Sequence, residues 1–409
     1  MQMKKNTVIT GIGIVSPIGI GRDAFWENLF LGKCGIKQIT LFDTKDLNVK
    51  SGGEISDFNP HKILNEKTLM DLDRATLLLL CAAKYCLEDA DFSVNEDNST
   101  RTAVSVGTTF GSIFSISRFN RESFTEGPRY VNPSIFPSTV GNSAASRIAI
   151  KFKIKGFNST ISTGMCAALD ALDYARDAIE LDRAEQVLVG CVEDLSIQAF
   201  LGFYKLKYLS GVKNNTPLLS CPFDKRRDGI VFSEGATVFL LQTNGSASNA
   251  HVYGKILGIG SCFDPAKFYR YSPKGEGMKE AMRLALKDAG LEPKDIDCVF
   301  ANANSTKDAD AIESRAIREV FGKKAEDVLV TAIKSMVGET VSNSGGIALA
   351  AALAAIDKQM IPPTINYLQK DTNCDLNYVI NNPKKNKVSR VLVNCFGPNG
   401  TNTSVIVGK

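Results

Sequence analysis

The stretch at residues 8–19, which reads VITGIGIVSPIG, decides the fold class of this chain. Its first half is apolar and rich in β-branched residues, which favours a buried strand, and Ser16-Pro17-Ile18-Gly19 ends that strand in a turn. The residues that follow, 22–31, have the pattern of a helix. A buried strand that turns into a helix is the repeating unit of an α/β protein.

The same order of elements recurs outward from this stretch. In the first half, further buried strands are expected at 102–106, 158–162, 186–189 and 236–241, and helices at 72–87, near 143 and at 167–180. In the second half, strands are expected at 251–259, 298–301, 329–331, 390–394 and 402–407, and helices at 277–289, 309–321 and 345–356. Strands that alternate with helices predict largely parallel sheets.

The order of elements divides the chain into two α/β halves. We expect one domain at 1–248 and a second at 249–409, joined near the polar stretch NGSASN at 244–249. The halves share no recognisable sequence identity. The prediction of an internal structural duplication therefore rests on the order of elements alone.

Composition excludes several classes of function. The 48 basic and 44 acidic residues give a net charge of only +4, which does not favour nucleic-acid binding. The chain has only two histidines, His61 and His251, and its ten cysteines form no CxxC pair, so neither a metal site nor a disulfide framework is expected. We expect buried thiols in a reducing compartment and no cofactor.

Nothing in the sequence suggests a membrane protein. The N-terminus runs directly into the first strand and lacks the pattern of a signal peptide. The longest apolar run, at 345–356, is shorter than the roughly 20 residues that span a bilayer. The sequence therefore predicts a soluble, cytoplasmic protein.

Five segments together resemble the β-ketoacyl-acyl carrier protein synthases, in the same order and at similar spacing, over almost the whole chain. They are 8–19 (VITGIGIVSPIG), 132–142 (NPSIFPSTVGN), 222–235 (PFDKRRDGIVFSEG), 334–338 (KSMVG) and 394–402 (NCFGPNGTN). The resemblance implies the thiolase fold, a five-layered αβαβα arrangement of two similar halves that works as a dimer. In active members, it implies a cysteine nucleophile at a helix N-terminus, two histidines and two backbone N–H groups that stabilise an oxyanion.

The nucleophile position holds a different side chain here. Aligning the segment on Leu169-Asp170-Ala171 places Met165 where the family has its cysteine, and a thioether cannot form a thioester. Cys166 is the next residue, which turns it by roughly 100° around the helix. Cys166 is therefore expected to be a buried structural thiol.

Three further positions depart from the family pattern. Asn304, in the segment NANST, lies where the first histidine is expected, and Glu339 follows KSMVG where the second is expected. A structural ion pair between Lys334 and Glu339 is predicted. Pro398 replaces the phenylalanine that supplies an oxyanion N–H, and proline has no N–H to donate. From these four positions, we expect that the chain is not an enzyme on its own, but a subunit of a β-ketoacyl synthase heterodimer.

Within the family, the chain resembles the chain length factors of bacterial type II polyketide synthases. The segments 126–131 (EGPRYV) and 169–171 (LDA) carry this resemblance, although chain length factors commonly have glutamine where this chain has Met165. The resemblance implies an active ketosynthase as heterodimer partner, with an acyl carrier protein docking mainly on that partner. It implies no nucleic acid or membrane partner. An aromatic product of the octaketide or anthraquinone type is the first expectation, and an aryl polyene pathway stays open.

The resemblance also implies where the chain length is set and where the subunits meet. Side chains on the helix after the turn at 107–111 close the interface tunnel, and the alignment places them at Ile113, Ile116 and Asn120, although Ile113 and Ile116 are also compatible with ordinary core positions. The dimer contacts are expected from Ser134 or Ile135 and from Asn158 and Thr160 in the strand at 156–162.

Two other functions stay open at this point. The chain is also compatible with an atypical condensing enzyme or a malonyl-carrier protein decarboxylase that uses Cys166. It is equally compatible with a homodimeric binding protein or scaffold that has no ketosynthase partner.

Overall fold

A long buried strand at the N-terminus organises the fold of the computed structural model. The residues that the structure describes are 7–67, 69, 72–213, 216–245, 247, 250–265 and 269–409. Strand β1 (Thr7–Ser16) is buried along its whole length. It pairs antiparallel with β8 (Gly235–Thr243) and, at Val8 and Ile9 only, with β9 (Gly254–Phe263). This short second pairing joins two sheets into one continuous hydrogen-bonded path.

The two halves of this path have similar mixed topologies. On one side of β1, the order continues through β8, β7 (Gln186–Glu193), β5 (Thr102–Gly107) and the edge strand β6 (Asn158–Ile161). On the other side, it continues through β9, β16 (Thr401–Gly408), β15 (Arg390–Phe396), β10 (Cys298–Phe300), β11 (Leu329–Thr331) and β13 (Asn377–Tyr378). The short strands β2 (Gly19–Ile20), β3 (Lys37–Gln38), β4 (Ser51–Gly52), β12 (Met360–Ile361) and β14 (Lys384–Lys385) lie at the periphery.

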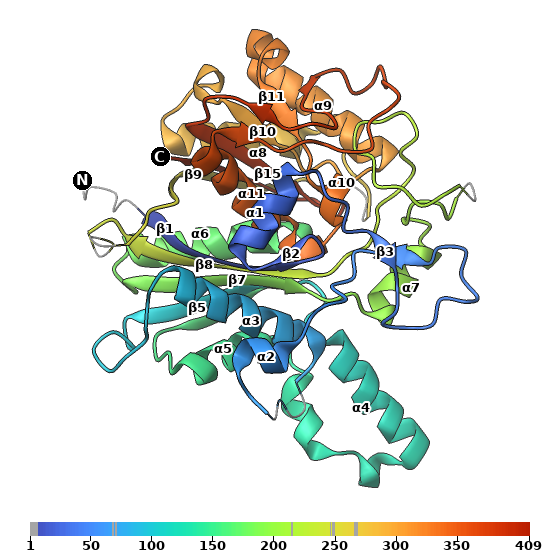
Figure 1. The fold of residues 1–409 in the computed structure, drawn as a ribbon, viewed down its shortest axis with the longest axis vertical. Helices are drawn as coiled ribbons and strands as arrows, with labels where there is room; N and C mark the ends of the chain where they lie inside the picture. The colour runs from blue at the N-terminus through green and yellow to red at the C-terminus, as the bar shows by residue number, and fades with distance from the viewer. Residues whose placement is uncertain are drawn as a thin grey trace.

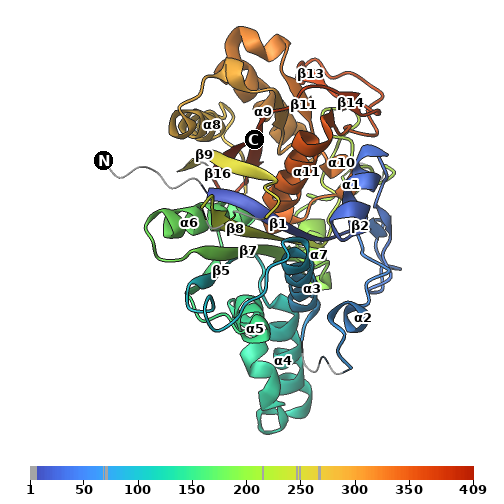
Figure 2. The same cartoon turned by 60° about the vertical axis from the view of Figure 1, so that its left-hand side comes forward.

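Helices cover both sheets and fill the space between them (Figure 1, Figure 2). The helices α3 (Arg74–Asp89) and α5 (Ser143–Phe152) pack on the outer face of the first sheet, and α8 (Glu276–Ala289) and α9 (Lys307–Phe321) on that of the second. Between the sheets lie α6 (Ala167–Glu180) and α11 (Ser344–Lys358). These five layers confirm the predicted αβαβα fold.

Local sequence explains two of the closest contacts in these layers. Helix α11 is apolar on nearly all sides and buried from Ser344 to Ile356, as expected for a helix enclosed by two sheets. Gly13 of β1 faces α3, where an added Cβ would lie 1.8 Å from the Ala82 carbonyl oxygen. The glycines of VITGIGIV therefore let the helix approach the strand.

Most predicted elements are present, with ends that differ by a few residues. Helix α6 and strand β11 have the predicted bounds. Helix α7 (Ile197–Lys205) was not predicted, and the remaining helices are α1 (Arg22–Phe30), α2 (Pro60–Leu64), α4 (Ile113–Glu126) and α10 (Lys334–Val337). The predicted domain boundary between 248 and 249 lies outside the described residues and stays a prediction.

Helix α4 projects from the body of the molecule (Figure 1, Figure 2). Within the chain, Ser115 is its one buried residue, held by a hydrogen bond of 3.0 Å from its hydroxyl to Asp73. Across the described parts of the chain, none of the helices combines the length and the apolar character that crossing a bilayer requires.

Candidate functional site

An apolar pocket of about 460 Å³ opens at the N-terminal end of α6. The loop after β5 contributes Phe110, helix α7 contributes Phe203, and the loop after β15 contributes Pro398. Met165 and Ile113 complete the set of predicted site residues that line it. The structure therefore brings the predicted nucleophile position, oxyanion position and first gate residue to one cavity.

Met165 lies in a 3₁₀ turn, Gly164–Cys166, that leads directly into α6. Its side chain is 4% exposed and faces the pocket, at the place where a helix N-terminus favours a negative charge. A thioether carries no such charge, so the position has the setting of a nucleophile without a nucleophilic group.

Cys166 is not among the residues that line this pocket. Its side chain is fully buried, and its thiol donates a hydrogen bond of 3.0 Å to the Cys395 carbonyl oxygen. The Cys395 thiol in turn donates to the Met165 carbonyl oxygen over 3.0 Å. A side-chain hydrogen bond with the Cys166 sulfur and burial raise the pKa of the Cys395 thiol well above its usual value. Both thiols are thus buried in the packing behind Met165.

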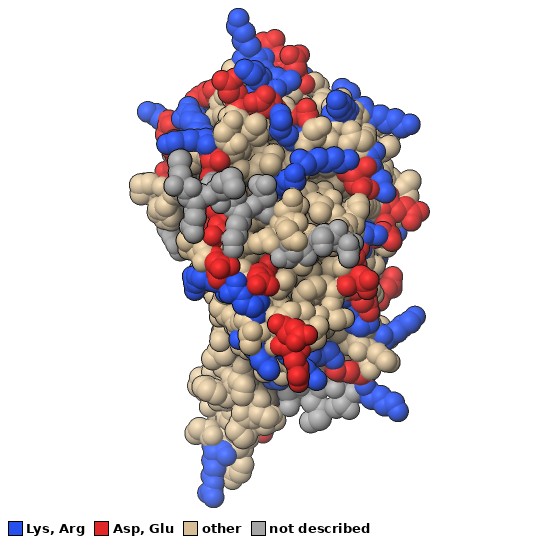
Figure 3. Space-filling view, turned by 90° about the vertical axis from the view of Figure 1, so that its left-hand side faces the viewer, with Lys and Arg blue, Asp and Glu red and all other residues tan. Residues whose placement is uncertain are grey.

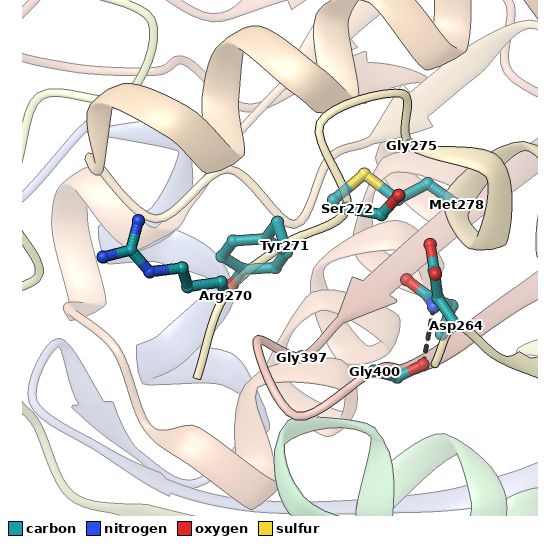
Figure 4. A pocket seen from close by; sticks show the side chains of 9 residues that line it. Asp264, Arg270, Tyr271, Ser272, Gly275, Met278, Gly397 and Gly400 are labelled. Atoms are coloured by element: carbon teal, nitrogen blue, oxygen red, sulfur yellow. Dashed lines mark hydrogen bonds between the residues drawn. The ribbon is translucent and has the colours of Figure 1, made fainter. Parts of the chain in front are cut away.

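The loop that carries Pro398 is fixed against the segment before Met165. The Gly397 N–H donates to the Thr401 carbonyl oxygen at 2.8 Å, which closes the loop. The Thr401 hydroxyl donates to the Thr163 carbonyl oxygen at 2.9 Å. The other side of the loop is held by the Asp264 N–H, which donates to the Gly400 carbonyl oxygen over 2.7 Å (Figure 4). Pro398 is therefore held at the pocket wall, and it offers no N–H.

Asn304 is buried beside two tyrosines that the sequence did not single out. Its side-chain oxygen accepts hydrogen bonds from the Thr306 N–H and hydroxyl, and its Nδ2 donates to the Tyr271 hydroxyl over 3.4 Å. Tyr271 donates to the Phe396 carbonyl oxygen over 3.3 Å, and burial raises its pKa well above the usual value. Tyr208 lies next to this group and lines the pocket. No motif marks either tyrosine in the sequence.

The predicted ion pair between Lys334 and Glu339 is confirmed. Its Nζ–Oε2 distance is 2.9 Å, and both side chains are almost completely buried. The remaining Glu339 oxygen accepts from the Val341 N–H at 3.0 Å and from the Ser344 hydroxyl. Lys334 also donates to Asn302 at 2.9 Å. These contacts of Glu339 hold the segment that ends at Val341, which lines the pocket.

Two buried carboxyl groups on α9 hold the segment that contains Asn304. Glu313 accepts from the Asn302 N–H at 2.9 Å and the Ala303 N–H at 2.7 Å, and Asp310 accepts from the Asn304 N–H at 2.9 Å. Burial raises the pKa of Glu313 to about 7 and that of Asp310 to about 6. The position of Asn304 therefore depends on two groups that titrate near neutral pH.

The three predicted gate residues do not share one environment. Ile113 is half-buried and lines the pocket. Ile116 is 42% exposed and Asn120 is exposed, because α4 projects from the body beyond its first turn. Asn120 faces no cavity within this chain, and its predicted place in a tunnel at the subunit interface stays a prediction. Only the first gate position reaches the cavity.

The predicted dimer residues also differ in how exposed they are. Ser134 and Asn158 are exposed, and Thr160 lies in β6, at the edge of the large sheet. Ile135 is 3% exposed because its side chain packs within its own chain, so of the two alternatives Ser134 is the one on the surface, and its contact with a partner stays a prediction. The neighbouring Phe136 is 58% exposed.

Within the described ranges, no three His, Cys, Asp or Glu side chains are grouped closely enough to hold a metal ion.

Comparisons with known proteins match the whole chain. Residues 4–247 match the family model described as "Beta-ketoacyl synthase, N-terminal domain", and residues 253–368 match "Beta-ketoacyl synthase, C-terminal domain". A 3-oxoacyl-[acyl-carrier-protein] synthase 2 of Coxiella burnetii is 32% identical over 409 residues, which cover 99% of both chains. One from a Synechocystis strain is 33% identical and covers 99% of this chain and 98% of its own.

Solved structures of polyketide ketosynthases have the same fold. The ishigamide ketosynthase/chain length factor matches with a TM-score of 0.92 and 30% identity over 100% of both chains. A type II polyketide acyl-carrier protein in complex with its ketosynthase bound to the hexaketide matches with a TM-score of 0.89 and 27% identity over 99% of both chains. The thiolase-like ketosynthase fold predicted from the sequence is confirmed.

These relatives contradict one expectation. The chain was expected not to be an enzyme on its own, yet relatives that match it from end to end are named as synthases. The expectation rested on Met165, Asn304, Glu339 and Pro398 alone, and side chains at four positions do not outweigh similarity along the entire chain. It was wrong and is not carried further.

Proposed function

Since the chain belongs to the β-ketoacyl synthase family, we propose that it works as the chain length factor of a type II polyketide synthase. In this role it pairs with a homologous ketosynthase, receives intermediates that an acyl carrier protein delivers, and shapes the space into which the polyketide grows. The product is an aromatic polyketide, with an octaketide or anthraquinone type as the first expectation.

The observation that carries the proposal is Met165 at the wall of an otherwise intact pocket. The cavity, the helix N-terminus and the closing loop are all present, while the side chain at the nucleophile position has no ionisable group. A pocket that is kept with methionine at this position fits a synthase built from two unlike copies. The solved ketosynthase/chain length factor with a TM-score of 0.92 supports such a pair.

The surface around α4 supports a protein partner. Phe114, Ile116 and Phe124 of α4 are 47%, 42% and 87% exposed, and Phe136 lies nearby against Phe119. Exposed apolar patches of this kind commonly mark interfaces. In Figure 3, the lower extension of the molecule, where Figure 2 places α4, is mostly free of charged side chains on the face shown. A partner that covers this face would also close the pocket beside Ile113.

The similarity to 3-oxoacyl-[acyl-carrier-protein] synthase 2 favours a second candidate, a condensing enzyme that works without an unlike partner. In such an enzyme a thiol of this chain would carry the acyl group. Cys166 is the candidate, because it directly follows Met165, which lines the pocket. Its complete burial and its hydrogen bond to Cys395 favour the first candidate.

Intact-protein mass spectrometry distinguishes the two candidates. The chain, a homologous active ketosynthase and their complex are each incubated with malonyl-loaded carrier protein. The proposal expects a stable complex in which the acyl adduct is on the ketosynthase subunit. An adduct on this chain alone that disappears in Cys166→Ala would establish the second candidate instead.

A further inference from the structure

We propose that Cys166 and Cys395 are a redox-sensitive pair, which a peroxide converts into a disulfide inside the chain. The bond would join the turn that carries Met165 to β15, whose following loop carries Pro398. Neither cysteine lines the pocket. The inference does not depend on the proposed function, because both thiols belong to this chain and the reagent is a small two-electron oxidant.

The two sulfurs lie between the same two backbone segments. The Cys166 thiol donates to the Cys395 carbonyl oxygen at 3.0 Å, and the Cys395 thiol donates to the Met165 carbonyl oxygen at 3.0 Å. Each sulfur thus reaches the backbone beside the other cysteine, and the turn at Gly164–Cys166 lies against β15. A disulfide needs two cysteines on neighbouring segments whose side chains face each other. The reciprocal contacts of Cys166 and Cys395 meet this requirement.

The Cys395 thiol keeps its proton, which sets the order of the steps. A side-chain hydrogen bond with the Cys166 sulfur and burial raise its pKa well above the usual value. The Cys166 sulfur therefore attacks the peroxide first: the O–O bond breaks, one water leaves, and Cys166 becomes a sulfenic acid. The Cys395 sulfur then attacks the Cys166 sulfur, and the S–O bond breaks to release a second water. Two thiols are oxidised to one disulfide, and one peroxide is reduced to two waters.

The pocket gives a small oxidant a route towards the pair. Both cysteine side chains are fully buried, which excludes a bulky reagent. The pocket wall includes Met165, the residue before Cys166, and Pro398, three residues after Cys395. The cavity therefore ends one residue along the chain from Cys166. A molecule close to water in size, such as hydrogen peroxide, suits this approach.

The chain also provides a matched control for burial. Cys191 is 2% exposed, and its thiol donates to the carbonyl oxygens of Gly107 at 2.9 Å and Ser342 at 3.0 Å. It is therefore a buried, hydrogen-bonded thiol whose two printed partners are not cysteines. Cys34 is exposed and can link two chains, so the experiment uses the Cys34→Ser background.

The test treats the full chain carrying Cys34→Ser with hydrogen peroxide, alkylates the remaining thiols in denaturant, and measures the masses of the protein and its peptides. The product should take up two fewer alkyl groups and contain one cross-linked peptide pair with Cys166 and Cys395. Dithiothreitol should restore both thiols. Cys191→Ala should form the same cross-link, and Cys395→Ala should not. Cys395→Ser replaces Cys395→Ala if the alanine variant unfolds on a thermal melt.

Unchanged alkylation after peroxide treatment, or a cross-link between other cysteines, would overturn the proposal. Oxidation confined to Met165, seen as the gain of one oxygen, would also overturn it, because the oxidant would then reach the pocket without joining the pair. Since these measurements use the single chain, their failure is separable from a failure to form the heterodimer.

Discussion

Lys334 and Glu339 show how a charged pair can occupy a site where the family resemblance expects a histidine. The pair is almost completely buried, and its oxygens are shared with the Val341 N–H and the Ser344 hydroxyl. Breaking a buried pair leaves one charge without its partner, which is far more costly than losing an exposed pair.

Lys334→Met should therefore lower the free energy of unfolding by about 3–5 kcal/mol, because the Glu339 carboxylate loses its cation inside the protein. Urea denaturation measures this change. The control is Lys45→Met, which removes an ion pair with Asp43 on the surface and should change the free energy by less than about 1 kcal/mol. Equal effects of the two substitutions would refute the structural role of the pair.

Glu313 makes the stability of the site depend on pH. Because burial raises its folded-state pKa to about 7, the folded protein holds a proton that the unfolded chain releases near its ordinary pKa of 4.5. The stabilisation is present below pH 4.5 and is lost as pH rises through about 7. Between pH 5 and pH 8, the wild type should lose on the order of 3 kcal/mol that Glu313→Gln does not lose. Parallel pH profiles of unfolding for the two proteins would contradict this.

The sequence located some site residues and not others, for a physical reason. Met165 and Pro398 could be placed because each sits in a short segment that resembles a motif of the family. Tyr208 and Tyr271 could not, because they meet Asn304 only through tertiary packing between distant segments. The alignment left Ser134 and Ile135 as alternatives, because successive residues of a 3₁₀ turn point about 120° apart and the sequence alone does not say which one faces outward.

Among the elements, β6 has the geometry to pair with another subunit. Phe157, the residue before β6, and Ile161, its last residue, turn their carbonyl oxygens to the β5 side, where they accept from the Val104 and Thr108 N–H groups. Since alternate residues of a strand face opposite edges, the backbones of Asn158 and Thr160 face the open edge. An exposed edge of this kind is a ready template for a further strand.

Thr160→Pro should abolish the complex with the ketosynthase, because proline removes the N–H that the open edge offers and leaves the pairing with β5 intact. Sedimentation velocity of the co-expressed proteins measures the complex. Thr160→Val keeps the N–H and loses only the hydroxyl, so it should assemble normally. A complex that survives Thr160→Pro would show that β6 does not lie at the interface.

Helix α4 shows that residues on one helical face can lie in different environments. Ile113, Ile116 and Asn120 lie on one face by spacing, yet only Ile113 meets the pocket because the helix leaves the body after its first turn. Helix α7 was missed since its nine residues, IQAFLGFYK, are a short apolar run that contains a glycine. Both helices line the pocket. The sequence therefore predicted the pocket residues Met165 and Pro398 better than those that α7 contributes.

At the scale of the whole molecule, the alternation of strands and helices predicted an α/β protein. The five layers were implied by the resemblance to the family alone, and the structure has them. The junction of the two sheets through Val8 and Ile9 could not be foreseen, because two residue pairs leave no pattern in the sequence. Similarity over the whole chain likewise corrected a conclusion drawn from four side chains.

The central claim, that this chain helps to set polyketide length, is tested most directly by the mass of the carrier-bound product made by the reconstituted pair. Ile113→Phe adds bulk where α4 meets the pocket, so the product should become shorter while the complex stays intact. Arg118→Phe, on an exposed part of the same helix, should leave the length unchanged. An unchanged product length with Ile113→Phe, or an equal product from the ketosynthase without this chain, would contradict the account.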